Sequence, residues 1–117
     1  MVKTHTNHYK YPIMNIQFNT DNHIEGTESL ESYFSDKISN GLKHFEEHIT
    51  RVEVHLSDQN ADKGGANDIQ CKLEARVKGL QPITVTSQDT SKEKAVNEAI
   101  DKMKSVLRTT MGKLKDK

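Results

Sequence analysis

The chain has 117 residues, a formal net charge of zero, and an apolar fraction of 32% without tryptophan. A chain of this length fits one domain with a modest core and leaves no room for a second. No apolar run approaches the roughly 20 residues that span a bilayer, and residues 1–12 lack the apolar centre of a signal peptide, so we expect a soluble, cytoplasmic protein. The single Cys71 excludes an intrachain disulfide, and its alternating position predicts a buried thiol.

Residues 1–12 show no clear period, so we predict a flexible N-terminal arm followed by a single folded domain over residues 13–117. A first strand opens this domain, because apolar and polar residues alternate there as they do on a strand with one buried face. Its apolar positions are Met14, Ile16 and Phe18.

A helix is predicted next, from about Glu28 to about His44. Thr27 is a suitable N-cap, and Glu28 is well placed near the positive end of the helix dipole. Apolar residues then recur at helical spacing. They are Leu30, Phe34, Ile38, Leu42 and Phe45. Gly41 costs about 1 kcal/mol relative to alanine inside a helix, which weakens the last turn.

Three further strands are predicted from alternating patterns. Their apolar positions are Val52, Val54 and Leu56 in the first, Ile69, Cys71, Leu73, Ala75 and Val77 in the second, and Ile83 and Val85 in the third. Residues 58–67 are predicted to form a hairpin loop with Gly64 and Gly65 at its tip, and residues 79–82 a second turn.

A second helix begins after residues 90–93, whose sequence TSKE predicts a capping box with Thr90 as the N-cap and Glu93 reaching back to it. The helix has one continuous apolar stripe at positions that share a face, and we expect this stripe to be buried. The stripe consists of Val96, Ile100, Met103, Leu107, Met111 and Leu114. Gly112 is a candidate end of this helix.

The predicted order is therefore β-α-β-β-β-α, which indicates an α+β fold. A right-handed crossover makes the first two strands parallel, and the remaining strands form an antiparallel meander. Each strand has one apolar face and each helix one apolar stripe, so both helices must cover the same face of a four-stranded mixed sheet. The other face is left to water or to a partner.

The sequence contains no recognisable catalytic constellation. It lacks a nucleophile elbow, a phosphate loop and a Cys-x-x-Cys motif. Six histidines are present, but their spacing completes no metal site. We therefore expect a protein that is not an enzyme and needs no cofactor or metal. A weaker alternative is an enzyme whose site combines His55, Glu74 and Arg76.

Charge is distributed unevenly along the chain. After Asp89, eight Lys and Arg residues stand against four acidic residues, which gives this segment a net charge of +4. Along one flank of the second helix, downstream of Asn97, the spacing aligns three cations, Lys104, Arg108 and Lys115. Such a ridge suits phosphates, whose neutralisation releases counterions. The alternative is that these cations keep the helix soluble and pair with the acidic residues Glu98 and Asp101.

The second helix also carries a resemblance. Residues 95–103, AVNEAIDKM, together with Leu107-Arg108 and the later lysines, resemble the ribosome hibernation-promoting factors and ribosome-associated translation inhibitors of bacteria. Residues 15–18, NIQF, and residues 42–45, LKHF, resemble the first strand and first helix of that family. The chain departs from the family pattern at Asn97, where an aspartate is usual, and at Lys94, where an aromatic residue is usual. Without a long C-terminal extension, it resembles the short members.

The resemblance implies a fold related to double-stranded RNA-binding domains and a place on the small ribosomal subunit, over the sites for messenger and transfer RNA. It implies binding to ribosomal RNA and inhibition of translation in stationary phase or stress, with no membrane and no small-molecule substrate as partner. The RNA-binding residues expected from the family positions are Lys37, Lys43, Lys102, Arg108, Lys113 and Lys115, to which the helical projection adds Lys104. The alternative is a domain of the same fold that binds a protein partner, or homodimerises, through its open sheet face.

Overall fold

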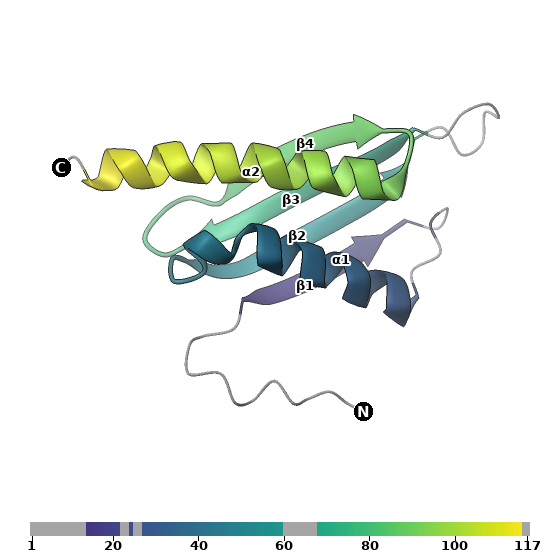
Figure 1. The fold of residues 1–117 in the computed structure, drawn as a ribbon, viewed down its shortest axis with the longest axis horizontal. Coiled ribbons are helices and arrows are strands. Elements are labelled where there is room, and N and C mark those ends of the chain that lie inside the picture. Colours follow the sequence, from purple (N-terminus) through teal and green to yellow (C-terminus); the bar gives the residue numbers. More distant parts are fainter. Residues whose placement is uncertain (1–13, 22–23, 25–26, 60–67, 116–117) are drawn as a thin grey trace.

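The computed structural model describes residues 14–21, 24, 27–59 and 68–115, and it confirms the predicted order of elements (Figure 1). The strands are β1 (Asn15–Thr20), β2 (Ile49–Asp58), β3 (Ile69–Val77) and β4 (Ile83–Asp89); the helices are α1 (Glu28–Gly41), the short 3₁₀ turn η2 (Lys43–Phe45) and α2 (Lys92–Lys115). The predicted arm over residues 1–12 and the glycine pair at the hairpin tip lie outside the described residues.

The four strands form one mixed sheet in the order β1-β2-β3-β4. β1 pairs with β2 in parallel, and β2, β3 and β4 pair as an antiparallel meander, as predicted. The register sets Val54 beside Phe18 on one side and Leu73 on the other, so that the apolar faces of neighbouring strands coincide. This alignment gives the sheet one apolar face and one polar face.

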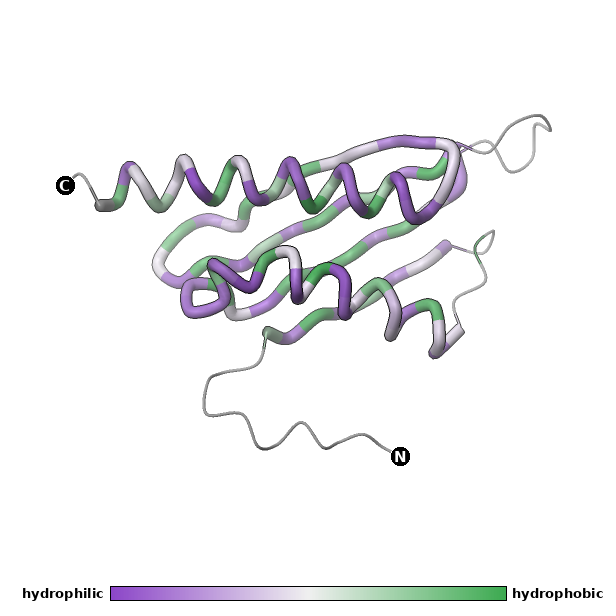
Figure 2. Tube along the Cα trace, viewed as in Figure 1, coloured by the Kyte–Doolittle hydropathy of each residue, from purple (hydrophilic) through white to green (hydrophobic). Residues whose placement is uncertain are grey.

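Both helices lie across the same face of the sheet, and the core fills the space between the two layers (Figure 1). Hydrophobic and hydrophilic residues alternate along the strands and follow a longer period along the helices (Figure 2). Cys71 belongs to this core and is fully buried, and burial raises the pKa of its thiol to about 12. The prediction of a buried thiol is confirmed.

Helix α1 begins as predicted, because the Thr27 hydroxyl accepts a hydrogen bond from the Leu30 amide at 3.1 Å. It ends earlier than predicted. The α-helix stops at Gly41, and η2 carries the chain onward, so the expected end at about His44 was three residues too late. Leu42 and Phe45 are nevertheless buried, because the tighter 3₁₀ turn still directs them into the core.

Two predictions about α2 are wrong at its ends. Ser91, not Thr90, is the cap: the Ser91 hydroxyl accepts from the Lys94 amide at 3.1 Å, whereas the Thr90 amide donates to the Asp89 carboxylate at 2.6 Å. Asp89 thus engages Thr90 in the turn and shifts the cap by one residue. Gly112 does not stop the helix, which continues to Lys115. A single glycine costs only about 1 kcal/mol in a helix, too little to end one that packs along most of its length.

Candidate nucleic-acid interface between the two helices

The side chains that join α1 to α2 meet at Glu93, in the first turn of α2. The Tyr33 hydroxyl donates to the Glu93 carboxylate at 2.8 Å, and the Lys37 ammonium lies 3.6 Å from the same carboxylate. Lys37 also lies 5.6 Å from the centre of the Tyr33 ring. The hydrogen bond to Glu93 raises the pKa of Tyr33 above its ordinary value. Lys37, predicted to bind RNA, is therefore already engaged within the protein.

Farther along the same flank, the two helices approach each other at Gly41. A Cβ atom at this position would lie only 2.6 Å from Cγ2 of Ile100, so the approach requires glycine. Glu93 and Ile100 both contact α1, which shows that their flank of α2 faces α1. Because residues three and four apart share a helix face, Lys104 and Arg108 continue this flank beyond the contact.

Lys104 is half-buried and Arg108 is exposed. Among the described residues, neither forms a salt bridge, and neither pairs with Glu98 or Asp101 as the solvated-face alternative had supposed. Both cations are thus open to a ligand. Lys115, the last residue of α2, occupies the next turns of the helix, but its side chain lies outside the described part.

The remaining predicted cations of α2 lie on its other side. The Lys102 ammonium donates to the backbone carbonyl of Thr86 on β4 at 2.6 Å, at the free edge of the sheet. Lys113 follows eleven residues later, about three helical turns, and therefore shares that side. The predicted RNA-binding residues do not form one patch: Lys102 and Lys113 face the β4 edge, away from the flank of Lys104 and Arg108.

The last turns of α2 extend past the ends of the strands (Figure 1). There, a cavity of about 350 Å³ lies between α2 and the segment around η2. It is lined by His44, Phe45, His48, Met111 and Leu114. Lys43, exposed, directly precedes His44. The sequence prediction placed Met111 and Leu114 in the core. The apolar stripe of α2 is longer than the strands on which the helix packs, and this difference in length could have indicated the cavity.

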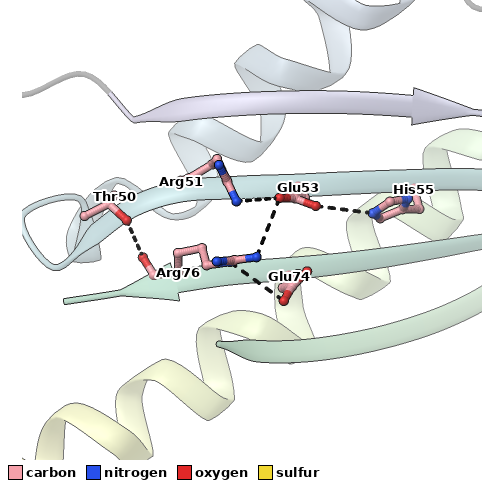
Figure 3. Close-up of polar contacts among 6 residues, drawn as sticks. All are labelled: Thr50, Arg51, Glu53, His55, Glu74 and Arg76. Atoms are coloured by element: carbon pink, nitrogen blue, oxygen red, sulfur yellow. Dashed lines mark hydrogen bonds and ion pairs between the residues drawn. The ribbon is translucent and has the colours of Figure 1, made fainter. Parts of the chain in front are cut away.

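The open face of the sheet carries a network of charges that satisfy one another (Figure 3). The Glu53 carboxylate lies 2.8 Å from Arg51, 3.7 Å from His55 and 4.0 Å from Arg76. Arg76 also lies 3.9 Å from Glu74. The three residues of the enzyme alternative thus belong to a surface ion-pair network, in which His55 pairs with Glu53 and not with Glu74.

Two further observations concern the histidines and the helices. In the ranges that the structure describes, no group of three or more His, Cys, Asp or Glu side chains is placed to hold a metal ion. Neither helix there combines the length and apolarity that crossing a membrane requires.

Comparison with known proteins identifies the family. Residues 16–115 match the family described as sigma 54 modulation protein / S30EA ribosomal protein. The chain belongs to this family. Membership in the S30EA family confirms the resemblance noted in the sequence, and it confirms the prediction that the protein is not an enzyme.

Solved structures agree with this assignment at the level of the fold. The chain is similar to the N-terminal domain of Thermus thermophilus Protein Y, with a TM-score of 0.67 and 16% identity over 83% of this chain and 99% of that one. It is also similar to a ribosomal subunit interface protein from Coxiella burnetii, with a TM-score of 0.62 and 16% identity over 89% of this chain and 100% of that one. No functionally curated protein shows significant sequence similarity to it.

Proposed function

We propose that this S30EA-family protein is a ribosome-associated hibernation factor that binds ribosomal RNA of the small subunit near the messenger and transfer RNA sites. In this position it blocks translation under stress or in stationary phase, and it acts in the cytoplasm without chemical turnover. The single observation that carries the proposal is the family match, which extends over nearly the whole described fold.

The arrangement of charge supports the same function. Lys104 and Arg108 stand on the flank of α2 that faces α1, and neither is neutralised by a salt bridge among the described residues. Lys43 is exposed close to the end of that flank. Cations placed in this way suit a phosphate backbone. We therefore propose Lys43, Lys104 and Arg108 as the main contacts, with Lys37, Lys102, Lys113 and Lys115 as contributors.

The open sheet face offers less support for the rival function, a protein partner or a homodimer. Stable homodimer interfaces are more apolar than the rest of a protein surface. This face instead carries Arg51, Glu53, Glu74 and Arg76, whose charges already pair with one another. Covering it would remove water from several charges without forming new pairs for them.

Co-sedimentation with purified small ribosomal subunits tests the proposal. The wild-type protein is expected in the ribosomal pellet at moderate salt and to inhibit translation in a cell-free system. Reversal of both flank charges, Lys104→Glu with Arg108→Glu, is expected to lower affinity on the order of 100-fold, because each change removes an attraction and adds a repulsion.

Lys72→Glu provides the control, since Lys72 is exposed on the open sheet face and its reversal changes the net charge in the same direction, by half as much as the double variant. It is expected to bind as the wild type does. Absence of the wild-type protein from the ribosomal pellet would refute the proposed function. Equal losses in the control and in the flank variant would refute the proposed surface.

A further inference from the structure

The cavity between η2 and the end of α2 has a composition that suits a flat aromatic ligand. Its walls include the apolar side chains of Phe45, Met111 and Leu114. Leu114 is 45% exposed, so part of this apolar lining faces solvent. Two exposed histidines, His44 and His48, complete the lining.

The histidines add both a stacking surface and polar groups. The His44 ring meets the Phe45 ring edge-on at a centroid distance of 5.3 Å, so Phe45 supports it from inside the core. Imidazole rings stack on nucleobases, and their nitrogens donate to or accept from the polar edge of a base. A volume of about 350 Å³ lies at the lower end of the range for small-molecule sites, about 300–1,000 Å³.

Cations are arranged next to the cavity where the phosphates of such a ligand would lie. Arg108 precedes Met111 by about one turn, and Lys43 directly precedes His44; both cations are exposed. Glu46 and Glu47 lie in the turn before His48 and place negative charge on that side of the cavity. Phosphates are therefore expected on the α2 side of the opening.

From this combination we infer that the cavity receives one unpaired nucleobase of an RNA, stacked against His44 over the apolar floor, while Arg108 and Lys43 hold the adjacent phosphates. The inference rests on the proposed function and deepens it, because it adds recognition of an unstacked base to a contact otherwise made through phosphates. Sequence-independent stacking of this kind suits single-stranded or bulged RNA.

Two RNA hairpins provide the test: one carries a single bulged 2-aminopurine, and the other has an abasic nucleotide at the same position. The wild-type protein is expected to bind the 2-aminopurine hairpin on the order of tenfold more tightly and to quench its fluorescence by stacking. His44→Ala and Leu114→Glu are expected to remove both the preference and the quenching. His44→Phe keeps the ring and should retain them, as should the matched control His55→Ala on the open sheet face.

Equal affinity of the wild-type protein for the two hairpins, or no binding to either, would overturn the inference, as would quenching that survives both cavity variants. A photoreactive diazirine amino acid that replaces Leu114 should crosslink to RNA when the protein is bound to small subunits and irradiated. Crosslinking to a ribosomal protein instead would assign the cavity to a protein side chain and overturn the inference. Each of these failures leaves co-sedimentation of the wild type intact, whereas failure of the proposed function abolishes it.

Discussion

The two halves of α2 use charge in opposite ways. The first half, residues 92–103, contains three lysines and three acidic residues, so its net charge is zero; the second half, residues 104–115, contains four cations and no acidic residue, so its net charge is +4. In the first half, Glu93 binds Tyr33 and Lys37, and Lys102 binds the carbonyl of Thr86. In the second half, the described cations form no salt bridge with other described residues.

Packing follows the same division. The core positions of the first half are fully or almost fully buried, whereas in the second half Leu107 is buried, Met111 is half-buried and Leu114 is exposed. One helix thus serves as part of the core at its start and as a charged surface at its end. Mutations that disturb packing in the first half should therefore lower stability, whereas the loss of cations from the second half should weaken binding.

The largest effect is expected where Gly41 of α1 packs against Ile100 of α2. Gly41→Ala places a Cβ atom 2.6 Å from Cγ2 of Ile100, in the first half of α2, and should lower the free energy of unfolding by about 1–2 kcal/mol. Gly112→Ala, in the second half, meets no atom within 4 Å and should raise it by about 0.5–1 kcal/mol. Urea denaturation measures both free energies of unfolding. If the two variants changed the free energy in the same direction, the expected difference between the two halves of α2 would be contradicted.

The next effect concerns binding. Arg108→Ala should weaken association with small ribosomal subunits about tenfold and reduce the salt dependence of binding by about one phosphate contact. Lys94→Ala, which removes an exposed cation from the first half, should stay within about twofold of the wild type. Titrations at several salt concentrations measure both quantities. Comparable losses for the two variants would show that position along the helix does not matter.

A smaller effect is expected from two hydroxyl groups that donate to helix carbonyls. The buried Ser87 hydroxyl on β4 donates to the Ala95 carbonyl at 2.5 Å, so Ser87→Ala should cost about 1 kcal/mol of folding free energy. Thr110 donates to the Val106 carbonyl at 2.8 Å on an exposed turn of the second half. Thr110→Ala should change stability by no more than about 0.5 kcal/mol. Thermal denaturation measures the loss of stability in each variant. A larger loss for Thr110→Ala than for Ser87→Ala would contradict the difference in packing between the two halves of α2.

The smallest effect is a pH dependence in the first half. A hydrogen bond between the carboxyl groups raises the pKa of Glu98 and lowers that of Asp89. The stabilisation linked to protonated Glu98 is present below its ordinary pKa and is lost as the pH rises through the raised pKa; the contribution of Asp89 is present above its ordinary pKa and is lost as the pH falls through the lowered one.

Once the pH has risen through the raised pKa of Glu98, both carboxylates are charged and repel each other. Glu98→Gln keeps a donor for Asp89 without the charge, so its Tm should exceed that of the wild type slightly at pH 7. The difference should shrink toward a pH of about 4, where carboxyl groups take up protons. Glu47→Gln, on an exposed turn, serves as the control. A Tm difference between Glu98→Gln and the wild type that is independent of pH would exclude this pair as its origin.

Much of the fold could be predicted because its signals are local. Alternation in the strands, the apolar stripe of α2 and the cap at Thr27 each depend on residues within a few positions of one another. The error in the cap of α2 arose because two adjacent residues compete for one role. Thr90 and Ser91 are both suitable caps, and the side chain of Asp89 decided between them.

The candidate site was less predictable, because its geometry depends on contacts between distant residues. The projection of α2 aligned Lys104 with Arg108, and the structure keeps them on the flank that faces α1. Lys37, however, meets Glu93 from another helix, and Lys102 reaches a backbone carbonyl on β4. Spacing along the chain contains no information about either partner.

By itself, the sequence determined the order of the elements, the faces that are buried and the excess of positive charge near the C-terminus. These follow from periodicity and composition, which act over one or two turns of backbone. Only the tertiary structure decided which cations remain available and where α2 leaves the sheet to form a cavity with His44 and His48. The physical reason is that a side chain's charge is neutralised, or its surface covered, by whichever neighbours the packing of helix on sheet brings within a few ångströms.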